Sequence, residues 1–127
     1  MNEARILIVD DNEINIELAR HVLENDGFVV QGACDAIAAM AGVESFRPHL
    51  ILMDIQMPGM DGLQLSRRLK SDPATWHTVI VAFTAYAMKG DEAKMRAAGC
   101  DGYIPKPIDI ATFASHVRAQ LEVRAMS

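Results

Sequence analysis

Five short runs of apolar residues recur along the chain, and each is followed by a segment whose apolar residues have helical spacing. The runs cover residues 6–9, 28–30, 50–53, 79–83 and 103–104. Strands that are apolar on both faces are typical of a parallel sheet covered by helices on each side. The alternation therefore predicts an α/β fold of the (βα)5 type, built on one five-stranded parallel sheet.

The segments between these runs are expected to form helices. In the first, Ile14, Leu18 and Val22 recur every fourth residue and are expected to face the core, and Gly27 is expected to end the helix. Two more helices are expected over 36–46 and 88–98, and another around Leu65 and Leu69. Asp109 is expected to cap the start of the last helix, which is expected to bury Ile110, Phe113, Val117 and Leu121.

Composition limits the classes of function. The chain has 127 residues, enough for one domain with a hydrophobic core, and a formal net charge of −5. A negative charge disfavours direct binding to nucleic acid or to anionic membranes. No apolar run approaches the roughly 18 residues of a membrane-spanning helix, and the first residues lack a signal-peptide pattern. We therefore expect a single cytoplasmic domain over residues 1–127, with Cys34 and Cys100 reduced.

Two of the apolar runs end in acidic residues. Asp54 follows the run 50–53, and Asp10 and Asp11 follow the run 6–9. Parallel strands end at one edge of a sheet, where open α/β folds bind their ligands. Three carboxylates placed together repel one another, and Mg²⁺ takes such oxygen ligands. One acid alone would be an ordinary strand end, and Asp11 or Asn12 could cap the next helix. Acids that end two buried strands favour a cation site.

Two further polar residues follow the later strands. Thr84 comes directly after the run 79–83, where its hydroxyl could donate to an anion, although a threonine is also an ordinary strand end. Lys106 lies between Pro105 and Pro107, and its ammonium could balance the acids or hold a phosphoryl oxygen. The four histidines lack metal-ligand spacing and are expected to be structural: His21, His49, His77 and His116.

Four motifs at these strand ends resemble the receiver domain of two-component response regulators. They are Ile8-Val9-Asp10-Asp11-Asn12, the stretch from Leu52 to Gly62 that contains Asp54 and Pro58-Gly59, Phe83-Thr84-Ala85, and Tyr103-Ile104-Pro105-Lys106-Pro107. The resemblance covers essentially the whole chain. It implies a flavodoxin-like fold with strand order 2-1-3-4-5 and helices on both faces of the sheet. Residues 87–91 are similar to single-domain regulators and to receivers attached to hybrid kinases.

The resemblance also implies roles for the acids. Asp54 would accept a phosphoryl group. Asp11, Asp54 and the main-chain carbonyl of Gln56 would bind Mg²⁺, or Mn²⁺ in its place, and Asp10 would help through a water molecule.

The remaining roles concern the phosphoryl group after transfer. Thr84 and Lys106 would bind its oxygens, and the movement of Thr84 would let Tyr103 rotate inward. Tyr103 would be the switch residue on the surface formed by the fourth helix, the fifth strand and the fifth helix. Gln56 and Tyr86 would flank the path of a hydrolytic water, and the bulk of Tyr86 would slow loss of the phosphoryl group.

The implied function is that of a phosphoaccepting signalling switch that promotes its own phosphorylation and dephosphorylation, rather than that of a conventional turnover enzyme. Its donor would be a histidine kinase or a histidine phosphotransferase, and its output would pass to a downstream protein. The chain could instead be a receiver cut from a hybrid kinase or from a longer regulator.

Two interpretations belong to other functional classes, and the second of them shares this fold class. A Mg²⁺-dependent phosphohydrolase with Asp54 as nucleophile usually needs an acid two residues later, and Gln56 cannot donate a proton in that role. A flavin-binding electron carrier would need a phosphate-binding loop after the first strand, where Asp10 and Asp11 would repel a phosphate in the absence of a metal.

Overall fold

The computed structural model describes residues 4–57, 60–84, 89–106 and 108–126. Five strands form its main sheet: β1 (Arg5–Val9), β2 (Val29–Ala33), β3 (Leu50–Met53), β6 (Val79–Thr84) and β7 (Gly102–Pro105). All neighbouring pairs in this sheet are parallel, and their order is β2-β1-β3-β6-β7. The expected order 2-1-3-4-5 is therefore confirmed for the strands of the main sheet.

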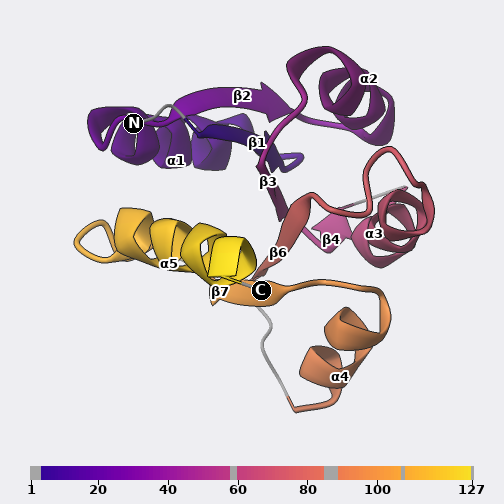
Figure 1. Cartoon of the computed structure of the whole chain (residues 1–127). Coiled ribbons are helices and arrows are strands. Elements are labelled where there is room, and N and C mark those ends of the chain that lie inside the picture. The colour runs from indigo at the N-terminus through magenta and orange to yellow at the C-terminus, as the bar shows by residue number, and fades with distance from the viewer. Residues whose placement is uncertain (1–3, 58–59, 85–88, 107, 127) are drawn as a thin grey trace.

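Helices cover both faces of this sheet (Figure 1). They are α1 (Glu13–Asn25), α2 (Ala36–Phe46), α3 (Gly62–Ser71), α4 (Lys89–Ala97) and α5 (Phe113–Met126). Alternate residues of β1 point to opposite faces. Ile6 and Ile8 pack in a cluster with residues of α1 and α5, whereas Leu7 and Val9 pack with residues of α2, α3 and α4. The continuous apolar run is thus explained by burial on both faces.

Local signals in the sequence set several helix ends. The Asn12 side chain accepts the N–H groups of Ile14 and Asn15 and so caps α1. Gly27 and Gly99 adopt positive φ angles of 96° and 95° just beyond α1 and α4, as expected of glycines that close helices.

The predicted buried face of α1 is wrong at Ile14 and Leu18, whereas Val22 packs against the core as predicted. Ile14 is 77% exposed and Leu18 is 40% exposed, while Ile16, Ala19 and Leu23 are buried. The helix carries two apolar stripes, and the one that includes the small Ala19 faces the sheet. The Ile16 side chain lies directly against the backbone of β2 at Gly32, where an added Cβ would come within 2.5 Å of it.

The start of the last helix also differs from the prediction. The helix begins at Phe113 rather than directly after the expected cap Asp109, and Ile110 is 64% exposed instead of buried. The Asp109 carboxylate accepts the N–H of Ala111 in the turn that precedes α5. Phe113 and Val117 are buried as predicted, and Leu121 packs against the same core.

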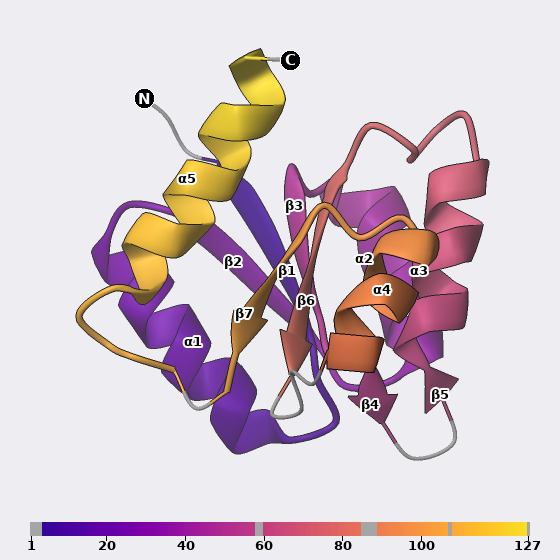
Figure 2. The same ribbon diagram turned by 90° about the horizontal axis from the view of Figure 1, so that it is seen from below.

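A short antiparallel pair, β4 (Gln56–Met57) and β5 (Met60–Asp61), lies between β3 and α3 and was not predicted. Figure 2 shows it on the side of the molecule to which β6 and β7 point. Within the described part of the chain, no helix is long and apolar enough to cross a membrane. Both cysteines are free, with Cys34 exposed and Cys100 buried.

Candidate functional site

The three acids that end the first and third predicted strands lie together. Val9 and Met53 are register partners, so β1 and β3 end level and bring Asp10 and Asp54 to the same edge. One carboxylate oxygen from each of Asp10, Asp11 and Asp54 lies within 4.8 Å of the other two. Asp10 and Asp54 are buried, at 0% and 4% exposure, whereas Asp11 is exposed. The site therefore has a buried floor and one acid at its mouth.

Lys106 joins the two buried acids. Its Nζ lies 2.9 Å from Asp10 Oδ2 and 3.1 Å from Asp54 Oδ2, and 5.0 Å from the centre of the Phe83 ring. Burial lowers the pKa of Lys106, but its hydrogen bond to Asp10 and the charges of Asp54 and Asp10 together raise that pKa above its ordinary value. The lysine is thus held as a cation between the acids.

Asp10 is fixed by donors on both of its oxygens. The main-chain N–H of Asn12 donates to Oδ1 at 2.9 Å, and the Asn15 side-chain amide donates to Oδ2 at 3.4 Å. Because Asn12 caps α1, the cap role considered for Asp11 falls to its neighbour. The Asp11 carboxylate could therefore bind a cation without removing the N-cap of α1.

Gly62, at the start of α3, lies directly against the backbone of Asp54. A Cβ added at Gly62 would lie 2.5 Å from the carbonyl oxygen of Asp54 and 2.7 Å from the Cα of Ile55. Both atoms belong to the backbone, so only glycine lets α3 begin this close to the acid. Sequence reasoning missed this residue, although a glycine at the start of an expected helix is a usable signal.

Thr84 and Lys106 are brought to the same edge by the pairing of β6 with β7. Thr84 is the last residue of β6, is 1% exposed, and is the register partner of Pro105. The main-chain N–H of Lys106 donates to the Thr84 carbonyl at 2.8 Å. The backbone of Gln56 lies in β4, two residues past Asp54. Tyr86 lies outside the described residues.

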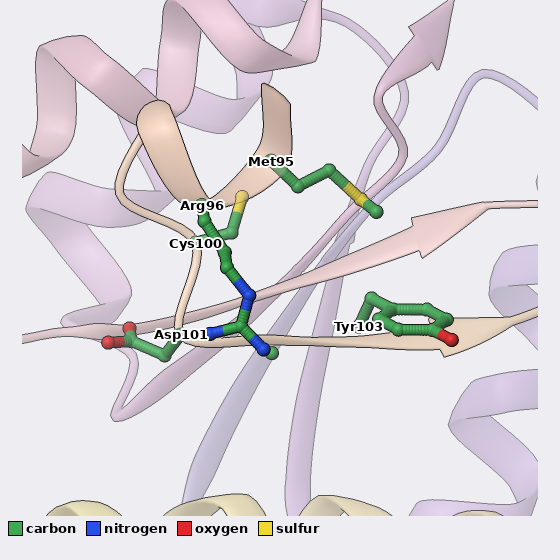
Figure 3. A pocket seen from close by; sticks show the side chains of 6 residues that line it. Met95, Arg96, Cys100, Asp101 and Tyr103 are labelled. Atoms are coloured by element: carbon green, nitrogen blue, oxygen red, sulfur yellow. The ribbon is translucent and has the colours of Figure 1, made fainter. Parts of the chain in front are cut away.

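Tyr103 is outside the acidic site, on the surface of β7. It is 39% exposed and lines a small pocket together with residues of α4 and of the segment before β7. Figure 3 shows its ring lying along the strand, with Met95 and Arg96 projecting from α4. This is an outward position for the residue expected to act as the switch.

The histidines take no part in this site. His49 accepts the main-chain N–H of Arg5 at Nδ1, at 2.9 Å, which is a structural contact at the opposite end of the sheet. Burial, and then the charge of Arg5, lower the pKa of His49. The side chains of His21, His77 and His116 are exposed.

The donor set fits a hard divalent cation. Its oxygens are all carboxylate, they come from adjacent strand ends, and one of the three acids is open to solvent. Such ligands suit Mg²⁺, which keeps several waters and binds few protein carboxylates. A carboxylate beside an ammonium, with further carboxylates that could hold a cation, is suited to phosphoryl transfer, because that reaction depends on positioning and charge neutralisation.

The chain is similar to known proteins of one family. The family model for the response regulator receiver domain matches residues 6–118. The polar-differentiation response regulator DivK of Brucella anthropi is 40% identical over 116 residues, which cover 91% of this chain and 94% of that protein. DivK of Brucella ovis is 39% identical over 116 residues, which again cover 91% of this chain and 94% of that protein.

Solved structures give the same picture of the fold. The chemotaxis protein CheY4 of Vibrio cholerae superimposes with a TM-score of 0.87 at 24% identity, covering 93% of this chain and 98% of that one. A CheY-like receiver from Methanospirillum hungatei gives 0.88 at 27%, covering 98% of both chains. The receiver domain of a histidine kinase from Syntrophus aciditrophicus gives 0.83 at 32%, covering 94% of this chain and 91% of that one.

Proposed function

The chain belongs to the response regulator receiver family, and on that premise we propose that Asp54 accepts a phosphoryl group from a phosphohistidine. The observation that carries the proposal is the pair of contacts from Lys106 to Asp10 and Asp54, with Asp11 beside them. Receiver domains are signalling modules rather than conventional enzymes, so the transfer serves as a signal.

The donor is a histidine kinase or a histidine phosphotransferase, and the reaction takes place in the cytoplasm. The 40% identity to DivK, a response regulator, supports a regulator that passes its signal to a downstream protein. The 32% identity to the receiver of a histidine kinase supports, as a second origin, a receiver that is part of such a kinase.

The cation of this proposal is Mg²⁺, with Mn²⁺ as a substitute. Asp11, Asp54 and the main-chain carbonyl of Gln56 would hold it, and Asp10 would contribute through a water molecule. When bound, the cation offsets the repulsion between the carboxylate and the phosphoryl oxygens.

The chain's own residues perform the transfer. An Asp54 carboxylate oxygen attacks phosphorus as the P–N bond of the phosphohistidine breaks, and the imidazole leaves with the electron pair. Lys106 then turns from the acids to a phosphoryl oxygen, and the Thr84 hydroxyl donates to another. The raised pKa of Lys106 keeps it charged for this role.

The acylphosphate sets the switch. Thr84 moves toward the new oxygens, and Tyr103, now 39% exposed, rotates inward to fill the space. The changed surface includes α4, β7 and α5. Gln56 and Tyr86 flank the approach of water and set the lifetime of the phosphoryl group.

Labelling by a small phosphodonor in the presence of Mg²⁺ tests the proposal. Asp54→Asn should abolish the label, because an amide is a far weaker nucleophile, whereas Asp109→Asn should leave it intact. Labelling of Asp54→Asn at the wild-type rate would contradict the proposal. Steady hydrolysis of a small phosphoester by the wild-type protein would favour a phosphohydrolase instead.

A further inference from the structure

Asp10 is a fully buried carboxylate that depends on its hydrogen-bond donors. It is 0% exposed, and a buried anion is costly unless its oxygens are satisfied. Oδ1 accepts the main-chain N–H of Asn12 at 2.9 Å. Oδ2 accepts from Lys106 Nζ at 2.9 Å and from Asn15 Nδ2 at 3.4 Å.

Lys106 cannot serve Asp10 throughout the proposed reaction. Its ammonium lies between Asp10 and Asp54, and the proposed function requires it to turn toward a phosphoryl oxygen. As it turns, Asp10 Oδ2 loses its charged partner. Among the described contacts of that oxygen, the amide of Asn15 then remains as its donor.

We infer that Asn15 is a positioning residue that holds Asp10 in place while Lys106 leaves, an inference that rests on the proposed function. Its own position is set by the start of α1, since its main-chain N–H lies 3.4 Å from the capping oxygen of Asn12. A first-turn residue of a capped helix therefore reaches back to the floor of the acidic site.

The chemistry of an amide suits this role. An amide donates a hydrogen bond without adding charge to the site. A lysine at residue 15 would add a second cation in competition with Mg²⁺, and an aspartate would add a fourth carboxylate beside Asp10. Asn15 keeps the Asp10 oxygen oriented and leaves the charge of the site unchanged.

The test uses Asn15→Leu, which keeps the size of the side chain and removes the donor, and Asn15→Gln, which restores an amide. Calorimetric titration with Mg²⁺ alone should show roughly three- to tenfold weaker binding for Asn15→Leu, at or below the usual range for residues that support metal ligands. Asn15→Gln should recover part of this loss. Asn25→Leu, an exposed asparagine at the far end of the same helix, should bind as the wild type does.

A second comparison separates positioning from general support of the fold. In the Lys106→Met background, Asp10 Oδ2 has already lost its charged donor, so Asn15→Leu should weaken Mg²⁺ binding by a larger factor than in the wild type. Equal factors in both backgrounds would show that the two residues act independently and would overturn the inference.

The titration also keeps this inference distinct from the proposed function. Wild-type affinity for Mg²⁺ in Asn15→Leu would overturn the role of Asn15, even if Asp54 is labelled normally. If the wild-type protein is not labelled but Asn15→Leu still weakens Mg²⁺ binding, the proposed function fails and the positioning of Asp10 by Asn15 stands.

Discussion

At the scale of the residue, the main feature of the site is the ammonium group of Lys106, which contacts both Asp10 and Asp54. Lys106 Nζ is within 3.1 Å of both Asp10 and Asp54, and both acids are buried. The lysine therefore acts as a resident counter-ion of these two carboxylates. Any divalent cation that binds the same acids must compete with it, because both are attracted by the same carboxylates.

Replacement of this lysine tests the counter-ion role. Lys106→Met should lower the free energy of unfolding by about 3–5 kcal/mol at neutral pH without Mg²⁺, since it removes the ammonium from two buried carboxylates. Added Mg²⁺ should then stabilise the variant more than the wild type, because its competitor is gone. Urea unfolding with and without Mg²⁺ measures both effects, with the exposed Lys94→Met as control. Equal stabilisation by Mg²⁺ in the two proteins would contradict this role.

His49 gives the fold a dependence on pH at the opposite end of the sheet. Burial and the charge of Arg5 lower its pKa below the ordinary value of 6.5, and its Nδ1 can accept the Arg5 N–H only when unprotonated. The unfolded chain therefore binds the proton more readily. This contribution to stability is present above pH 6.5 and is lost as pH falls through the lower, folded-state pKa.

Unfolding in urea between pH 7.5 and pH 5 measures this dependence. His49→Gln should show a shallower loss of stability on acidification than the wild type, while His21→Gln, at an exposed position, should match the wild type. An unchanged slope for His49→Gln would assign the pH dependence to other groups.

At the scale of the element, the sequence was most informative about the strands, because a strand in a parallel sheet between two layers of helices must be apolar. Apolar runs predicted all five strands of the sheet. The central strands β1, β3 and β6 are buried almost throughout, whereas the edge strands β2 and β7 are partly exposed. The face of α1 could not be chosen in this way, because the helix has two apolar stripes and the contact of Ile16 with β2 at Gly32 depends on the folded structure. The strands β4 and β5 have two residues each, too few to show a sequence pattern. The need for glycine at residue 62 depends on its distance from the backbone of Asp54 and Ile55, which the sequence does not give.

Two isoleucines of α1 test which face of the helix is buried. Ile16 is 5% exposed and Ile14 is 77% exposed. Ile16→Ala should lower the free energy of unfolding by about 2–4 kcal/mol, and Ile14→Ala should change it by less than about 0.5 kcal/mol. Urea unfolding of the two variants provides a matched comparison, and the reverse order of their effects would contradict the packing of α1.

At the scale of the whole molecule, β7 connects the acidic site with the surface. Lys106 follows its last residue, and Tyr103, three residues earlier, is partly exposed beside α4. The order of the motifs predicted that Asp10, Asp54, Thr84 and Lys106 meet at one sheet edge. It could not predict that Lys106 bridges two acids or that Asn15 reaches Asp10, because those contacts depend on side-chain positions between segments distant in the sequence.

This connection predicts exchange between two states before phosphorylation. To move a population from 1:99 to 99:1, phosphorylation must supply about 5.5 kcal/mol, which a few charge-assisted hydrogen bonds of about 1.5–3 kcal/mol each can provide. A minor state populated at about 1% before phosphorylation should be detectable by relaxation-dispersion NMR at Thr84 and Tyr103. Val117, in the core, should show none. A lack of exchange at both Thr84 and Tyr103 would contradict a pre-existing switch.

The central claim is that Asp54 carries the phosphoryl group, and locating the covalent adduct tests it most directly. The protein would be incubated with Mg²⁺ and a small phosphodonor, reduced with borohydride to trap the acylphosphate, digested, and examined by peptide mass spectrometry. We expect the reduced product at Asp54, and no product when Mg²⁺ is chelated. An adduct at another residue, or at none in protein that binds Mg²⁺, would contradict the account.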